Sequence, residues 1–317
     1  MKWEKLGMVF VVDEHRLPPP CVAFAQAPQA LVRDEGVRFY FSTRSIDSSG
    51  KALSHIAYAD LDGDFRVVHV GETPVLGPGA LGCYDEHGVF PLNVLRDGER
   101  VLGYVGGWSR RVSVQVDGAV GLAVSRDDGL SFERFADGPV LAASPSQPFL
   151  VGDPFVMKEG ATFHMWHIFG TRWLRLPGCA EPERVYKIGH ATSADGVTWE
   201  SHAGRAVADV LGDDECQALP TVARVGGSFH MLFCFREAAG FRRDRRRAYR
   251  LGHAVSDDLD TWIRDDASSG LSLGLGGWDS EMMCYPHLFS FRGDVYVAYN
   301  GNDFGRAGFG LARLAEA

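Results

Sequence analysis

The chain has 317 residues, of which 45% are hydrophobic and 23% charged, a composition typical of a globular protein with a sizeable core. A net charge of −9 argues against a general nucleic-acid binder, and no apolar stretch reaches the roughly 18 residues that cross a membrane. The first residues lack the apolar run of a secretory signal, and six scattered cysteines form no Cys-x-x-Cys pair, which favours a reducing compartment. We therefore expect one domain over residues 1–317 in the cytoplasm, without membrane or nucleic-acid partners.

A proline that opens a short apolar run recurs five times, at intervals of 63, 63, 66 and 66 residues. The five prolines are Pro28, Pro91, Pro154, Pro220 and Pro286. After each comes an aromatic-rich strand, as in residues 163–167, and then a Gly/Ala strand, as in residues 188–191. Three repeats continue with a Ser/Asp turn that ends in an aromatic residue, as in residues 193–199, and Asp and Gly suit a tight hairpin. Each repeat therefore predicts four antiparallel strands, and such sheets arranged radially form a β-propeller.

The two ends of the chain complete this pattern. The fifth repeat stops after its third strand, while residues 3–5 match the openings of the fourth strands at residues 132–134 and 199–201. We predict an all-β, five-bladed β-propeller whose N-terminal strand completes the last blade and leaves no unpaired edge at the seam. A β-sandwich with accidental spacing is the alternative interpretation.

Acidic residues gather before the repeated prolines, where the inner strands of a propeller begin around one mouth of its channel. They are Asp85, Glu86, Asp153, Glu215, Asp279 and Glu281. Paired carboxylates are what glycosidic cleavage requires, because one must donate a proton while another acts as base or nucleophile. Burial and mutual repulsion separate the pKa values of such a pair and so assign their roles. For each single residue, a turn or capping role is the alternative.

Arginines mark the same mouth. Arg44, Arg110, Arg172 and Arg236 stand 16 to 19 residues after their prolines, so each opens the loop between the second and third strands of its repeat. The loop at residues 235–250 holds seven arginines against two acidic residues. Guanidinium groups bind carboxylate or phosphate in bidentate fashion, so we expect an anionic ligand. Salt bridges to the acidic residues are the alternative.

Other side chains complete the expected site. Trp108 can stack on a sugar ring, and Gln26 and His287 are expected substrate contacts. The remaining histidines in strand positions do not form a ligand set by their spacing and are expected in the core or between blades. We predict no cofactor and no metal site, although an axial ion near His87 and His287 stays open.

With these features the chain resembles, along its whole length, the five-bladed glycosidase superfamily that includes arabinanases, xylosidases, invertase-like fructosidases and mannoside phosphorylases. The resemblance implies an Asp before the first-blade proline as base or nucleophile, an Asp-Pro in the third repeat as orienting residue, and a Glu in the next repeat as general acid. Asp153-Pro154 matches the second element, and Glu215-Cys216 resembles the Glu-Cys of invertase-like members, with the proline farther away. Ala27 stands at the first position.

We therefore expect a glycoside hydrolase-like enzyme that acts on a glycosidic bond of an anionic sugar or glycoconjugate. Glu215 would be the general acid, Asp153 the orienting residue, and Asp85 or Glu86 the base or nucleophile in place of Ala27. A phosphorylase in which phosphate attacks is one alternative, since it needs a single acid and would use the arginines. A non-catalytic carbohydrate-binding propeller is the other.

Overall fold

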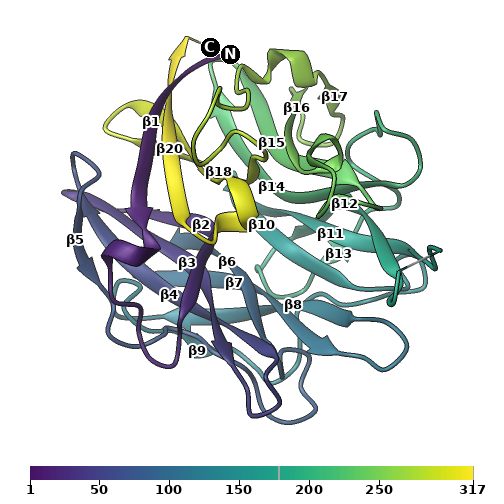
Figure 1. Ribbon diagram of the computed structural model, residues 1–317. Helices are drawn as coiled ribbons and strands as arrows, with labels where there is room; N and C mark the ends of the chain where they lie inside the picture. The colour runs from purple at the N-terminus through teal and green to yellow at the C-terminus, as the bar shows by residue number, and fades with distance from the viewer. Residues whose placement is uncertain (178, 317) are drawn as a thin grey trace.

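The computed structural model describes residues 1–177 and 179–316, and its strands form five antiparallel blades of four strands, of which the first two are joined into one sheet by a parallel bridge between Ser54 and Gly88 (Figure 1). Blade I consists of β2 (Ala23–Val32), β3 (Gly36–Ile46), β4 (Ala52–Asp62) and β5 (Val67–Val70). Blade II consists of β6 (Gly88–Asp97), β7 (Arg100–Arg110), β8 (Val116–Ser125) and β9 (Glu133–Arg134). Blade III consists of β10 (Val151–Glu159), β11 (Thr162–Leu174), β12 (Glu183–Ser193) and β13 (Glu200–Ser201). Blade IV consists of β14 (Glu215–Val225), β15 (Ser228–Glu237), β16 (Arg250–Ser256) and β17 (Ile263–Arg264).

Blade V joins the two ends of the chain. It consists of β18 (Cys284–Phe291), β19 (Asp294–Asn300), β20 (Gly308–Glu316) and β1 (Lys2–Val11). The purple β1 and the yellow β20 lie side by side in Figure 1 and pair antiparallel along the whole length of β1. The inner strands contact one another in the order β2, β6, β10, β14, β18, and β18 contacts β2. The five-bladed propeller completed by the N-terminal strand is thereby confirmed.

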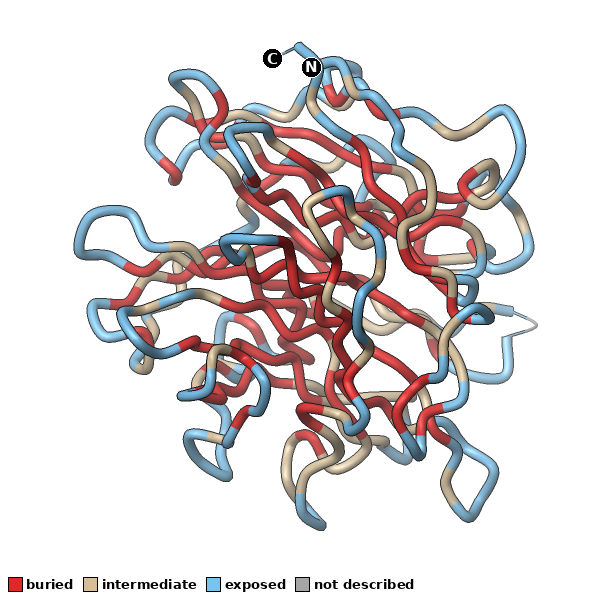
Figure 2. Tube along the Cα trace, turned by 90° about the vertical axis from the view of Figure 1, so that its left-hand side faces the viewer, coloured by how far each residue is buried: buried red, intermediate tan, exposed pale blue. Residues whose placement is uncertain are grey.

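Helical segments are short and lie in the connections. They are the 3₁₀ turns η1 (Val12–Glu14), η2 (Arg245–Arg247) and η3 (Asp266–Ser269), and the single turn α1 (Asn302–Gly305). In the described part of the chain, none has the length and apolarity that a bilayer crossing demands. Buried residues run along the inner strands, and exposed residues concentrate in the loops at their ends (Figure 2).

An aromatic residue on the second strand of blades I, II and III contacts the next blade. The Tyr40 hydroxyl on β3 donates to the Gly129 carbonyl in the Ser/Asp turn of blade II, at 2.7 Å. Tyr104 on β7 donates in the same way to Gly196 in blade III, at 2.9 Å. Trp166 occupies this place on β11 and packs edge-on against Trp262 of blade IV. Blades I, II and III are therefore each attached to the next by an aromatic residue of the second strand that contacts the Ser/Asp turn region.

The repeated prolines interrupt the inner strands at one place. The pairing register shifts at the proline in all five blades, because proline donates no ladder hydrogen bond. In four blades the residue before the proline has a positive φ: 50° at Ala27, 49° at Asp153, 47° at Leu219 and 58° at Tyr285. A left-handed backbone costs an L-residue about 1–2 kcal/mol and is most often kept at functional sites. At these four positions the backbone departs from the regular strand conformation.

Candidate active site at the channel mouth

Asp153 is the one carboxylic acid among the five residues that precede the repeated prolines. It is buried beside an apolar cluster that holds Ala27 and Leu219, with Phe90 and Tyr285 packed against it. Burial raises the pKa of Asp153 to about 7, against smaller opposing effects of the Leu219 backbone N–H and of Arg184. A carboxylic acid with a pKa near 7 is still partly protonated at neutral pH, which is the state that a proton donor needs.

Arg236 lies next to this cluster and is almost fully buried. Its Nη2 donates to the Tyr186 hydroxyl at 2.9 Å, and Nη1 donates to the Glu237 carbonyl at 2.8 Å. The Tyr186 and Tyr249 hydroxyls lie 2.6 Å apart, and the guanidinium stacks 3.5 Å from the centre of the Phe241 ring. Its Nε is buried without a hydrogen-bond partner in the described residues. The guanidinium therefore keeps an unused donor on a rigid aromatic support.

Arg44 reaches the same cluster from blade I. Its Nη2 donates to Gln26 Oε1 at 2.8 Å, and Gln26 Nε2 donates to the Phe304 carbonyl at 2.7 Å. The Arg44 guanidinium lies 5.9 Å from the centre of the Phe90 ring, which in turn packs 5.4 Å from the ring of Tyr285. Side chains from all five blades thus contribute to the cluster beside Asp153.

The arginines of this cluster have no carboxylate partner. Arg44, Arg184 and Arg236 form no ion pair within the described part of the chain. Arg184 instead donates to Gln115 Oε1 at 3.3 Å. Arg184 acts on the Asp153 carboxyl, and Arg44 and Arg236 contact aromatic residues of the same cluster, which gives the site an excess of positive charge. Such a site attracts an anion.

Glu215, the predicted general acid, has a different environment. Its carboxylate is fully buried and accepts hydrogen bonds from Arg264 Nη1 at 2.6 Å and from Gln217 Nε2 at 2.9 Å. The backbone N–H groups of Val210 and Leu211 each donate to its other oxygen at 2.9 Å. Burial alone would raise its pKa, but these hydrogen bonds and the Arg264 charge lower it. The carboxylate is held ionised, which is the opposite of what the predicted role requires.

Asp85 and Glu86 do not join Asp153 either. Asp85 is buried in an ion pair with Arg134, whose Nη2 lies 2.7 Å from its carboxylate. A side chain at Gly106 of β7 would meet the Asp153 backbone, whereas one at Gly107 would meet Asp85. Neighbouring residues of a strand face opposite sides of the sheet, so blade II separates the two aspartates. Glu86 accepts from the Gly82 backbone in its own loop. The structure therefore does not bring Asp85 or Glu86 together with Asp153.

The other predicted contacts are distributed around this face of the molecule. Arg172 pairs with Asp214, Glu281 pairs with Arg245, and Asp279 accepts from Lys5 and from the Tyr299 hydroxyl. Trp108 donates to Ser54 Oγ at 2.6 Å and packs near His87. His287 is buried between Phe155 and Phe289. Of the predicted set, Gln26, Arg44, Asp153 and Arg236 come together, and the others have partners elsewhere.

Sequence reasoning missed the aromatic wall of the site. Phe90 and Tyr285 stand at the pre-proline position, and Tyr186 and Tyr249 contact Arg236. The two pre-proline aromatics share one repeat position with Asp153, and that shared position is the signal that could have found them. Tyr186 and Tyr249 carry no repeat signal that distinguishes them from core residues.

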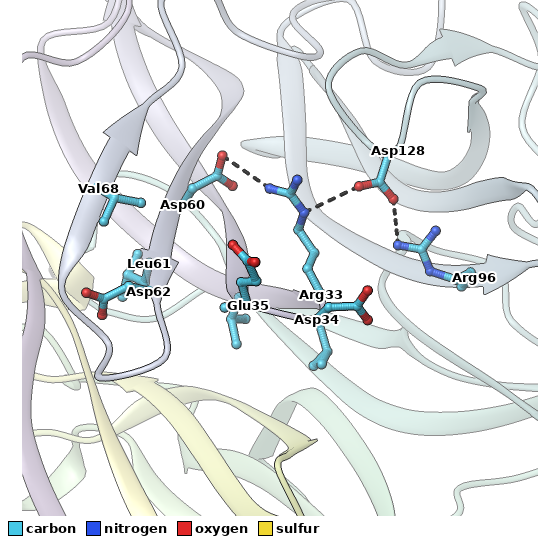
Figure 3. A pocket seen from close by; sticks show the side chains of 12 residues that line it. Arg33, Asp34, Glu35, Asp60, Leu61, Asp62, Val68, Arg96 and Asp128 are labelled. Atoms are coloured by element: carbon cyan, nitrogen blue, oxygen red, sulfur yellow. Dashed lines mark hydrogen bonds and ion pairs between the residues drawn. The ribbon is translucent and has the colours of Figure 1, made fainter.

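Two hollows lie away from this site. One, of about 760 Å³, surrounds the turn between β2 and β3, at the opposite end of this strand pair from Arg44 (Figure 3). Arg33 pairs with both Asp60 and Asp128, and Arg96 pairs with Asp128, while Asp34, Glu35 and Asp62 add further negative charge to the lining. The second, of about 260 Å³, lies beside Lys187 and Asp209, near Glu215. In both hollows the arginines and the lysine of the lining form ion pairs, unlike Arg44, Arg184 and Arg236.

Comparisons with known proteins identify relatives of the whole chain. The chain is 33% identical over 320 residues to the uncharacterized protein Rv1502 of Mycobacterium tuberculosis, covering 99% of both proteins, and equally to the uncharacterized protein MT1551 of another strain. The chain belongs to this family. No model of a known protein family matches it.

Solved structures with the same fold are carbohydrate enzymes at low identity. A glycoside hydrolase has a TM-score of 0.74 and 17% identity, over 99% of this protein and 93% of that one. A thermostable family-43 glycoside hydrolase has a TM-score of 0.66 and 13% identity, over 95% and 94%. A structure from work on GH130 mannoside phosphorylases and β-1,2-mannosidic linkages has a TM-score of 0.70 and 14% identity, over 98% and 93%. These likenesses show that the chain shares its fold with them.

Proposed function

We propose that the protein is a glycoside-processing enzyme that binds an anionic sugar or glycoconjugate at the channel mouth and uses Asp153 as its proton donor. The observation that carries this proposal is the environment of Asp153: a buried carboxyl whose pKa of about 7 is set by an apolar cluster. The fold shared with glycoside hydrolases supports the reaction class. Asp153 takes the role for which the sequence favoured Glu215.

The anionic substrate is supported by the unpaired arginines. Arg44 and Arg236 are held by neutral acceptors, so a ligand carboxylate or phosphate would meet no competing protein carboxylate there. A hydrogen bond between charged groups contributes about 1.5–3 kcal/mol. The buried Nε of Arg236 has no partner and would become such a donor where a ligand oxygen reaches it. A neutral sugar could not compensate the charge of these side chains.

Phosphorolysis is the second candidate, favoured because Asp153 stands without a carboxylate partner. Hydrolysis needs a second carboxylate to activate water or to attack the sugar. Phosphate would instead supply its own nucleophilic oxygen, and the arginines would bind it. A phosphate oxygen would then bond to the anomeric carbon, the glycosidic C–O bond would break, and the Asp153 proton would pass to the leaving oxygen.

The substrate class is tested by calorimetric titration of the protein with a panel of neutral sugars, their uronic acids and their 1-phosphates. The anionic ligands should bind more tightly, and Arg44→Ala should reduce that preference by roughly 10-fold or more, which is about one charge-assisted hydrogen bond. Arg172→Ala is the matched control, because Arg172 is exposed and already paired with Asp214. Equal affinity of the wild type for charged and neutral ligands would end the anionic proposal.

The reaction class is tested on the ligands that bind, with and without inorganic phosphate. Asp153→Asn should lower turnover by about 10²–10⁴-fold and leave affinity nearly unchanged. Turnover by the wild type should decline as the pH rises above about 7, because Asp153 then loses the proton that it must donate. A phosphate requirement would select phosphorolysis. Tight binding without any turnover would instead identify a carbohydrate-binding propeller.

A further inference from the structure

A second polar cluster lies between blades III and IV, apart from the residues that surround Asp153. His190 lies on β12, His202 directly follows β13, and Asp260 lies in the turn between β16 and β17. His190 Nδ1 is 3.5 Å from Asp260 Oδ1, and His202 Nδ1 is 4.0 Å from the same oxygen. One potential ligand atom from each residue lies within 4.8 Å of the others. Tetrahedral zinc separates its nitrogen and oxygen ligands by about 3.4 Å, so only small side-chain movements are needed.

The other nitrogens of both histidines are already engaged. His190 Nε2 is 3.1 Å from His164 Nδ1, and His202 Nε2 is 3.1 Å from Thr192 Oγ1. When each Nε2 carries the proton and donates it to these partners, both Nδ1 atoms present lone pairs toward Asp260. Metal-binding histidines are oriented in this way, by a hydrogen bond from the nitrogen that does not bind the metal.

The equivalent position in blade IV shows that the fold itself does not require this arrangement. There His230 and His253 form the same pair, with Nδ1 and Nε2 3.0 Å apart. Asp265 takes the place of His202, because its backbone N–H donates to the His253 carbonyl as that of His202 donates to the His190 carbonyl. The His253 Nδ1, however, bonds to the Asp265 carbonyl at 3.1 Å. Of blades III and IV, only blade III has two histidine Nδ1 atoms that face a carboxylate.

We propose that His190, His202 and Asp260 bind one divalent transition-metal ion, with zinc as the best match and water as the fourth ligand. Two imidazoles and one carboxylate suit zinc, whereas calcium and magnesium prefer oxygen ligands alone. The side chains of His202 and Asp260 are 39% and 66% exposed, so the ion can enter from solvent. Because Asp260 belongs to the next blade, the ion joins blades III and IV and stabilises their contact.

The metal site is tested by stripping the protein with a chelator, alkylating the exposed Cys179, and titrating with Co²⁺ and Zn²⁺. The wild type should bind one ion per chain, give the visible absorption of tetrahedral Co²⁺, and melt at a higher temperature with Zn²⁺. His202→Ala and Asp260→Asn should abolish all three signals. Both residues are exposed, and each variant should melt like the metal-free wild type, which shows that it has folded.

A matched pair of variants separates this site from adventitious binding. His164→Gln should weaken Zn²⁺ binding by about 10–100-fold, because it removes the hydrogen-bond partner of His190. His230→Gln changes the equivalent residue of blade IV and should leave the affinity unchanged. A wild type that binds no Co²⁺, or an Asp260→Asn variant that binds as the wild type does, would overturn the proposal. These readouts do not depend on catalysis at Asp153.

Discussion

Two buried carboxylic acids show how the surroundings of a single residue decide its chemistry. Glu215 meets an arginine, an amide and two backbone N–H groups, and is therefore ionised. Asp153 meets aromatic and aliphatic side chains, and its pKa rises to about 7. In the sequence, each of the two is an acidic residue that precedes a repeated proline, and nothing distinguishes their environments. The difference arises from Arg264, which lies 49 residues after Glu215 and bonds to it across blade IV.

Replacement of Glu215 should therefore affect stability and not proton donation. Arg264→Met should lower the free energy of unfolding by about 3–5 kcal/mol, because it leaves the Glu215 charge buried without a partner. Glu215→Gln should cost less, since Arg264 keeps its bonds to Asp266 and to the Ala208 carbonyl. Chemical denaturation measures both changes. If Glu215→Gln instead slowed only substrates with poor leaving groups, Glu215 would be the general acid after all.

At the scale of the element, the Ser/Asp turns form a repeated backbone support. In blade III the Asp195 carboxylate accepts from the Thr198 and Val197 N–H groups at 2.7 and 2.8 Å, and from the Ser193 hydroxyl at 3.0 Å. Asp127 and Asp258 make similar contacts in blades II and IV. The turn presents the Gly196 carbonyl to Tyr104, so the local motif also supports packing between blades.

Asp195→Ala should lower the melting temperature at neutral pH. The Thr198 and Val197 N–H groups lower the pKa of Asp195 to about 2 from 3.8, so its ionised form stabilises the fold. This contribution is complete above about pH 4 and is lost as the pH falls toward 2. Melting curves of the wild type and the variant should converge over that range. Asp195→Asn, which keeps one oxygen acceptor, should melt between the two, and a difference that does not change with pH would contradict the assignment.

At the scale of the whole molecule, the stability of the ring depends on pairing between the two ends of the chain. β1 pairs with β20 along its length, and Phe10 of β1 is fully buried against Phe41 and Phe309. The Trp3 indole N–H also donates to the Ser269 carbonyl, which ties β1 to the segment after blade IV. An unpaired strand edge would otherwise remain on blade V.

Deleting residues 1–12 should expose the edge of β20 and the apolar surface that Phe10 covers. We expect aggregation or loss of a cooperative melting transition, measured by scanning calorimetry and light scattering. Phe10→Ala alone should cost about 3–5 kcal/mol. Glu4→Ala is the control, because Glu4 lies on β1 like Phe10 but forms only an exposed ion pair with Arg313 of β20. It should cost less than about 1 kcal/mol. A truncated chain that melts as the intact one does would show that β1 does not close the ring.

The sequence by itself determined the architecture, because blade, turn and proline signals are local and recur five times. Pro154 interrupts its own strand, and the aromatic-rich residues 163–167 form the strand that pairs with it. The spacing of these signals therefore predicts where each strand lies. The strand exchange followed in the same way from the match between residues 3–5 and the other fourth strands. For the site, the repeat position included Asp153 among six acidic residues, and the loop position included Arg44 and Arg236 among four arginines.

Only the tertiary structure decided which of the acidic residues share a site and in what state. Asp85 and Asp153 both precede a repeated proline, yet they lie on opposite faces of blade II, and Arg134 reaches Asp85 from the outer strand. The cluster of His190, His202 and Asp260 was equally hidden, since its third member comes from another blade. The sequence repeats predict where a residue lies within its blade. Charge pairing and pKa depend on distances between side chains in space, and the spacing of residues along the chain does not give these distances.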